Sequence, residues 1–185
     1  MSTIHTTFDH RKKVNWVEAF LRFDIKAFEK LLCSQPEQFW LHAAQRRALN
    51  IFQDTAHKVP AYKDFLKKRK INPDAIRSIK DFDKVPTTDK RNYINEYPLV
   101  MRARDRCISN SSIIAESSGT TGEPTFWPRG GYQEFEAAII HELLYLTQFH
   151  TETHKTLLLI GFPMGAYVSG VATLLPSILI AQKKY

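Results

Sequence analysis

SSGTTGEPT, at residues 117–125, is the stretch that decides how this chain folds. Its two glycines allow backbone conformations that other residues avoid, and five hydroxyl side chains lie among backbone N–H groups. Such a loop can wrap an anion. The apolar residues Ile113, Ile114 and Ala115 predict a short buried strand before the loop, and the residues from Tyr132 onward predict a helix. The loop therefore leaves the end of a strand, where α/β proteins often bind ligands.

The composition is that of a globular chain. Its 185 residues and 43% hydrophobic content are sufficient for a sizeable core. Cys33 and Cys107 are far apart and lie in no metal-ligand spacing, which predicts two free thiols in a reducing compartment. The N-terminal residues have no apolar run behind their basic residues, so we expect no secretory signal and a cytoplasmic protein.

Positive charge is concentrated in the first part of the chain. Residues 1–110 contain 22 Lys/Arg against 13 Asp/Glu, whereas residues 111–185 contain 4 against 6. The densest basic run, at residues 67–70, follows Tyr62, Phe65 and Leu66 on a predicted short helix, and such a run is usually a solvated face. Because acids are interspersed and no nucleic-acid-binding motif is present, we expect no nucleic-acid partner.

The first part of the chain is expected to be mostly helical. Apolar residues at steps of three and four predict one amphipathic helix over 15–32, with Asn15 and Glu18 spaced as a capping box. A second helix is predicted from about Ser34 to the Val59-Pro60 pair. Four prolines then predict short helices and tight turns up to residue 98. Their predicted N-caps are Asn72, Ser78 and Thr88.

The second part contains a long uncharged segment, residues 156–181, which must be tested as a membrane span. Its glycines and prolines would break a single helix more than once. We therefore predict a buried strand at 156–160, a loop at 161–169 and a buried helix from about Gly170 that Pro176 can kink. A membrane span is the alternative, but we expect no membrane partner. The histidines are scattered singly, so no metal site is predicted.

The elements together predict an α/β fold. A mostly helical region at 1–110 leads into a partial sheet with flanking helices at 111–185. The order expected in this second region is strand, loop, helix, strand and helix.

SSGTTGEPT lacks the spacing of a Walker A loop, of the Rossmann glycine fingerprint and of a nucleophile elbow. It resembles instead the phosphate-binding loop of the adenylate-forming superfamily, in particular its phenylacetate-CoA ligase-like branch. The family pattern is roughly Ser/Thr-Ser/Gly-Gly-Ser/Thr-Thr-Gly-x-Pro-Lys/Thr. Residues 59–99, which include VPTTDK, and residues 161–170, GFPMGAYVSG, are similar to segments of the same branch. The resemblance covers about residues 59–181.

This resemblance implies ATP-dependent carboxylate activation. The acid attacks the α-phosphate of ATP, pyrophosphate leaves, and the resulting acyl-adenylate passes its acyl group to a thiol, typically that of coenzyme A. The loop would hold the phosphates together with Mg²⁺. The residues that the resemblance assigns to the phosphate cradle are Ser117, Ser118, Gly119, Thr120, Thr121 and Gly122.

The rest of the loop departs in part from the family. Pro124 would fix the exit of the loop, whereas Thr125 stands where many relatives have lysine. Glu123 adds negative charge, which Arg129 could offset unless that arginine forms a structural salt bridge. For the pocket that binds the acyl group of the carboxylic acid, we nominate Phe162, Gly165 and Tyr167, in the loop that follows the predicted apolar strand.

The chain ends before the family's Tyr-Gly-x-Thr-Glu segment, its ribose-binding aspartate and its C-terminal catalytic lysine. The resemblance therefore assigns no catalytic residue here, and we expect an N-terminal fragment or truncated homologue of the AMP-binding domain with little ligase activity by itself. The alternative is a non-catalytic nucleotide-binding or interaction module. The expected partners are a nucleotide and a small carboxylic acid, and exposed apolar surface makes a homodimer a further expectation.

Overall fold

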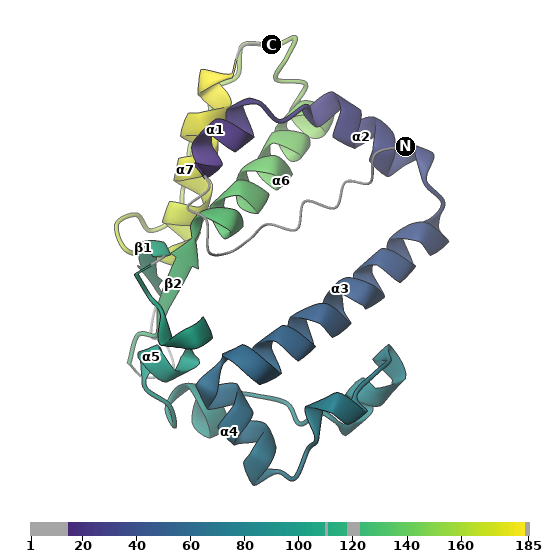
Figure 1. Ribbon diagram of the computed structural model, residues 1–185. Coiled ribbons are helices and arrows are strands. Elements are labelled where there is room, and N and C mark those ends of the chain that lie inside the picture. The colour runs from purple at the N-terminus through teal and green to yellow at the C-terminus, as the bar shows by residue number, and fades with distance from the viewer. Residues whose placement is uncertain (1–14, 110, 118–122, 184–185) are drawn as a thin grey trace. The chain divides into compact units, whose positions relative to one another are not determined.

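Figure 1 shows the computed structural model of the chain, which describes residues 15–109, 111–117 and 123–183. These residues are mostly helical, and their strands form one two-stranded antiparallel sheet. The prediction of a mixed chain with a helical first part is confirmed in this coarse sense. The contacts divide the chain into two compact units. We call residues 26–109 the helical unit, and the residues before and after them the sheet unit.

The helical unit is a series of helices whose caps come from the sequence. Its α-helices are α2 (Ile25–Ser34), α3 (Glu37–Lys58), α4 (Pro60–Lys68) and α5 (Leu99–Arg102), and its short helical turns are η1 (Pro73–Ala75), η2 (Ile79–Lys84), η3 (Lys90–Ile94) and η4 (Arg104–Arg106). Asn72 and Ser78 cap η1 and η2, as predicted. The predicted cap at Thr88 is wrong by one residue, because Asp89 Oδ1 accepts the N–H of Asn92 at 2.7 Å.

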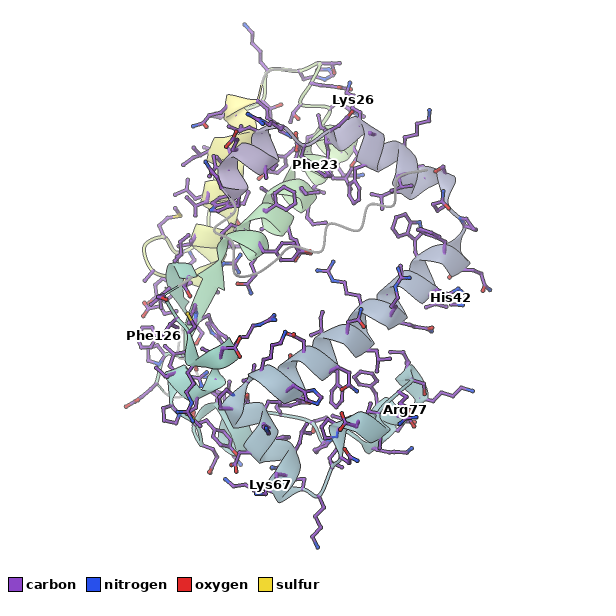
Figure 2. The ribbon with its side chains drawn as sticks, in the orientation of Figure 1. Phe23, Lys26, His42, Lys67, Arg77 and Phe126 are labelled. Carbon is purple, nitrogen blue, oxygen red and sulfur yellow. The ribbon has the colours of Figure 1, made fainter. Side chains whose placement is uncertain are left out.

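The predicted end of the second helix is confirmed, since Val59 terminates α3 and Pro60 begins α4. Proline suits a first helical position, where its missing N–H leaves no hydrogen bond unmade. The core of this unit lies between α3, α4 and the turns, and its buried residues are Phe52, Ala56, Phe65, Leu66 and Ile76. The basic run at 67–70 is exposed, as expected for a solvated face, and Lys67 is labelled in Figure 2.

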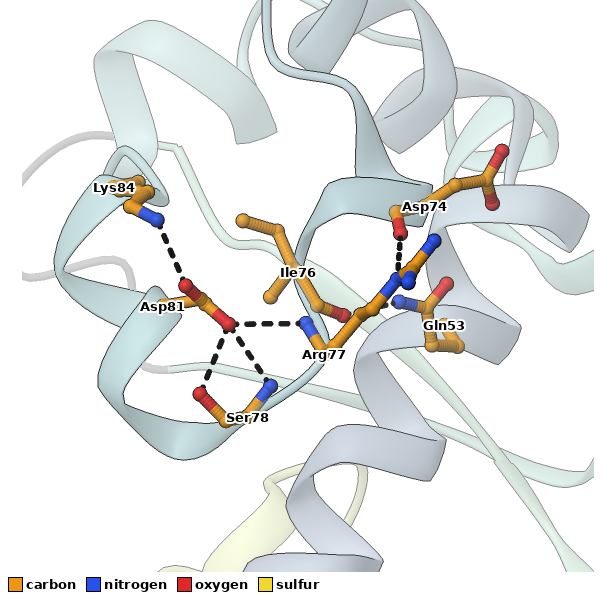
Figure 3. Close-up of polar contacts among 7 residues, drawn as sticks. All are labelled: Gln53, Asp74, Ile76, Arg77, Ser78, Asp81 and Lys84. Atoms are coloured by element: carbon orange, nitrogen blue, oxygen red, sulfur yellow. Dashed lines mark hydrogen bonds and ion pairs between the residues drawn. The ribbon is translucent and has the colours of Figure 1, made fainter.

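Figure 3 shows how the turns of this unit are fixed. The carboxylate of Asp81 accepts hydrogen bonds from the backbone N–H groups of Arg77 and Ser78 and from the Ser78 hydroxyl. Lys84 Nζ lies 2.7 Å from the other oxygen of Asp81. Hydrogen bonds to Lys84, Ser78 and Arg77 hold the pKa of Asp81 below its ordinary value, because each of them favours the charged carboxylate.

The sheet unit packs helices against one face of a hairpin. Its elements are α1 (Trp16–Leu21), β1 (Ser111–Glu116), β2 (Phe126–Gly130), α6 (Gly131–Phe149) and α7 (Val168–Gln182). The prediction of a helix from about Tyr132 is confirmed by α6. Its buried side chains include Phe20 from α1, Ala115 from β1, and Ala138 and Leu146 from α6.

Only one face of the predicted buried strand is buried. In the antiparallel register Ile114 pairs with Pro128, Ala115 with Trp127, and Glu116 with Phe126. Successive residues of a strand point to opposite faces, and cross-strand partners share a face. Ala115 therefore belongs to the packed face and Ile114 to the opposite one. Ala115 is fully buried, whereas Ile114 is 51% exposed. We call the face that carries Ile114 the open face.

The single helix predicted over 15–32 is wrong, because α1 ends at Leu21 and α2 begins at Ile25. Asn15 caps α1 by accepting the Glu18 N–H, as predicted. The chain turns at Phe23, whose carbonyl accepts a hydrogen bond from Lys183 Nζ at 3.0 Å and whose ring packs edge-on against Phe135. Apolar periodicity continues through this turn, so the sequence pattern alone does not reveal it.

The buried strand predicted at 156–160 is also wrong. These residues form no strand, and Leu157 and Leu159 are 84% and 82% exposed. A strand requires a neighbour for its backbone groups, and Glu116, at the end of β1, pairs with Tyr167 instead. The helix that follows is confirmed as α7, which contains Pro176, but it is only partly buried, since Ile178 is 47% exposed. No helix in the described ranges is both long and apolar enough to cross a bilayer.

Candidate functional site

The base of the loop at 117–125 is closed by two hydrogen bonds. The N–H of Ser117 donates to the carbonyl of Thr125, and the N–H of Thr125 donates to Ser117 Oγ, both at 3.0 Å. Thr125 is only 6% exposed. The two ends of the loop are therefore held together where β1 and β2 meet. Ser118, Gly119, Thr120, Thr121 and Gly122 lie outside the described residues.

The loop connects two strands of a hairpin. The sequence predicted a strand before it and a helix after it, but β2 comes between the loop and α6. The helix begins directly at the end of β2, where the Gly130 N–H donates to Gln133 Oε1 at 2.8 Å. As a result, the closed end of the loop and the N-terminus of α6 lie at opposite ends of β2.

Arg129 forms a structural salt bridge, one of the two roles left open by the sequence. Its Nε lies 2.5 Å from Oε1 of Glu134, which is fully buried. Arg129 is also four residues from Thr125 along an extended chain, a distance of roughly 13 Å. It therefore lies too far from Thr125 to supply a positive charge at that position. Glu123 and Pro124 are exposed at the exit of the loop.

One of the three residues nominated for the acid lies beside the loop. The N–H of Glu116 donates to the carbonyl of Ala166 at 2.8 Å, and Glu116 pairs with Tyr167 in a parallel bridge. Since Ser117 is the next residue, Tyr167 is adjacent to the base of the loop. Phe162 and Gly165 lie in the exposed segment before Tyr167. Gly165 has a φ of 85°, a left-handed conformation that favours glycine.

The sheet unit has little net charge, with eight Lys/Arg against nine Asp/Glu in its sequence. Of the four basic side chains that the structure describes in this unit, three form salt bridges, those of Arg22, Arg129 and Lys183. The sequence of the loop itself contains no basic residue. An anion bound there would be held by neutral hydroxyl and N–H donors. In the described ranges, no group of three His, Cys, Asp or Glu residues could hold a metal ion.

Sequence reasoning missed two residues beside the loop, Glu116 and Phe126. They are cross-strand partners on the open face of the hairpin. The available signal was the alternation of β1, in which Ile114 and Glu116 share a face that Ala115 does not. That signal identifies one face of β1 but not the strand that pairs with it. The sequence therefore could not show that Phe126 lies beside Glu116.

No protein-family model matches this chain, and no match was found among curated proteins.

Proposed function

We propose that the loop at 117–125 binds the phosphates of ATP, as part of a protein that activates a carboxylic acid as an acyl-adenylate. The observation that supports this most strongly is the closed base of the loop, where Ser117 and Thr125 hold its two ends together. Fixed ends reduce the conformational entropy that the loop loses when it surrounds a ligand. The glycines and hydroxyls between the ends are the residue types that a phosphate-binding loop requires.

The donor set of the loop fits a phosphate chain that arrives with its own metal ion. Hydroxyl and backbone N–H groups donate to phosphate oxygens without adding charge. Because the loop has no Lys or Arg, the charge of the triphosphate would be offset chiefly by Mg²⁺ bound to the nucleotide. Magnesium commonly binds in this way, through substrate phosphates and only a few protein ligands.

The position of Tyr167 supports an acid site next to the phosphate site. Tyr167 pairs with Glu116, and Glu116 immediately precedes the loop. An acid whose carboxylate attacks the α-phosphate must lie against the phosphate chain, so the segment at 162–167 is the part of the sheet unit that we assign to it. A thiol such as that of coenzyme A would then accept the acyl group. The second candidate, a nucleotide-binding module without catalysis, uses the same loop.

Calorimetry with ATP and Mg²⁺ tests the nucleotide site. We expect the chain to bind, and we expect Ser117→Ala to weaken binding by about fivefold to tenfold, since it removes one of the two hydrogen bonds that close the loop. Ser34→Ala is the matched control, because Ser34 is an exposed serine in α2 whose hydroxyl also makes one hydrogen bond. Absence of binding at millimolar ATP, or equal affinities for Ser117→Ala and the unmodified chain, would contradict the proposal.

Pyrophosphate exchange tests acid activation by this chain. Exchange that depends on an added carboxylic acid supports acid activation and rules out the binding module without catalysis, whereas ATP binding without exchange is the result expected of both candidates.

A further inference from the structure

We propose that the open face of the sheet binds an organic ammonium ion between the rings of Phe126 and Tyr167, above the carboxylate of Glu116. This site lies on the face of β1 opposite the side chain of Ala115, and it does not depend on the proposed binding of ATP. It is defined by three side chains that the backbone pairing brings into one row.

The row follows from two pairings of Glu116. Phe126 is its antiparallel partner, and Tyr167 is its parallel partner on the other side. Paired residues project from the same face of a sheet, so the three side chains leave it in one row with Glu116 in the middle. Neighbouring strands are about 4.8 Å apart, which places the Cβ atoms of Phe126 and Tyr167 roughly 10 Å from one another.

This spacing suits a cation. A positive group above Glu116 would lie one strand spacing, about 5 Å, from the rows on which Phe126 and Tyr167 stand, and a ring face attracts a cation within roughly 6 Å of its centre. The carboxylate below adds direct charge attraction. Quaternary ammonium groups are commonly recognised by aromatic rings in such an arrangement.

The three side chains are available to a ligand. Phe126 is 50% exposed and Tyr167 is 36% exposed, and Figure 2 labels Phe126 on the hairpin. Over the described residues, the carboxylate of Glu116 has no hydrogen-bond or salt-bridge partner, and neither ring stacks on another ring. Ile114, the next residue of β1 on this face, is also exposed and would contact the alkyl part of a ligand.

The charge of Glu116 favours a cation at this face. Salt bridges engage Arg22, Arg129 and Lys183 elsewhere in the described part of the sheet unit. An ammonium ion would be attracted by Glu116 and by the negative faces of both rings.

Titration of the full chain with choline, followed by NMR or calorimetry, tests the site. We expect a dissociation constant of about 1–10 mM, as for an exposed site with two rings and one carboxylate. The neutral isostere 3,3-dimethyl-1-butanol should bind at least about threefold more weakly, because it keeps the shape of choline and lacks the charge. Acetyl-trimethyllysine amide presents the same trimethylammonium group as a modified protein side chain would. Tighter binding of choline than of this amide indicates a small-molecule ligand, and tighter binding of the amide indicates a modified lysine.

Two variants connect binding to the row. Glu116→Gln and Phe126→Leu should each weaken choline binding by about twofold to fivefold. Glu37→Gln, at an exposed position in α3, changes the net charge equally and should leave binding unchanged. Equal affinity for choline and its neutral isostere, or unchanged affinity in folded Glu116→Gln, overturns the proposal. If Glu116→Gln does not fold, the comparison of the two probes on the unmodified chain still decides.

Discussion

At the scale of single residues, Lys183 connects three elements of the sheet unit. Its Nζ lies 2.8 and 2.9 Å from the two carboxylate oxygens of Glu142 and donates to the carbonyl of Phe23 at 3.0 Å. The ammonium also lies 4.3 Å from the centre of the Phe20 ring. All three of its N–H donors can thus be used in a buried site, so this charge holds the turn between α1 and α2 against α6.

Lys183→Met should lower the free energy of unfolding by about 3–5 kcal/mol, because it leaves the fully buried Glu142 without its cation. Urea unfolding measures the loss. Lys155→Met is the matched control, since Lys155 is exposed and its replacement should change stability by less than about 0.5 kcal/mol. The double variant Glu142→Leu with Lys183→Met should recover part of the loss. Equal stabilities of the two single variants would show that the buried pair has no such role.

Burial raises the pKa of Tyr93 to about 12. Its ring lies against Tyr62 and Phe65, where a phenolate would be poorly solvated. An unfolded tyrosine ionises near pH 10, so this group's contribution to stability is complete below about pH 10 and is lost as the pH rises toward about 12. Unfolding midpoints measured between pH 9 and 12 should fall less steeply for Tyr93→Phe than for the unmodified chain. Parallel slopes would contradict this assignment.

At the scale of elements, Gln53 ties α3 to the turn at η1. Its Nε2 donates to the carbonyls of Pro73 and Ile76 at 2.9 and 2.7 Å. Figure 3 shows the Gln53 side chain beside Ile76. Gln53→Ala should destabilise the chain by about 1–3 kcal/mol, because the Ile76 carbonyl loses its donor and the Pro73 carbonyl keeps only the N–H of Ile76. Gln38→Ala, at an exposed position of the same helix, should have little effect. Denaturant unfolding of both variants gives the comparison.

The contact between α7 and the loop before it depends on Gly170. A Cβ at this position would lie 2.5 Å from the carbonyl oxygen of Pro163, a backbone atom that cannot move alone. Gly170→Ala should therefore cost about 1–3 kcal/mol, although alanine is the better helix former. Gly161→Ala is the control, since a Cβ there meets nothing within 4 Å. A thermal midpoint of Gly170→Ala at or above that of Gly161→Ala would rule out the close contact.

Local signals predicted the helix boundaries better than they predicted the strands. Asn72, Ser78 and the Val59-Pro60 pair act through atoms only a few residues away, so their roles can be read from the sequence. The turn at Phe23 depends on Lys183, which is 160 residues further along the chain. The failed strand at 156–160 has the same cause, because strand formation depends on a partner that apolar composition does not specify.

At the scale of the whole molecule, positive charge is concentrated in one unit. The helical unit has 18 Lys/Arg against 10 Asp/Glu, whereas the sheet unit has eight against nine. The candidate loop belongs to the nearly neutral unit. Of the candidate site, the sequence predicts the loop and its donor types. It does not predict the closure of the loop by Ser117 and Thr125 or the approach of Tyr167, because both depend on strand pairing.

The relative affinities of ATP, ADP and AMP, measured by calorimetry in the presence of Mg²⁺, test the central claim most directly. If the loop at 117–125 holds the terminal phosphates, their removal takes away hydrogen bonds to charged oxygens, and AMP should bind at least about tenfold more weakly than ATP. ADP should lie between them. Equal affinities for the three nucleotides, or no binding of any of them, would contradict the assignment of this loop to the phosphates of ATP.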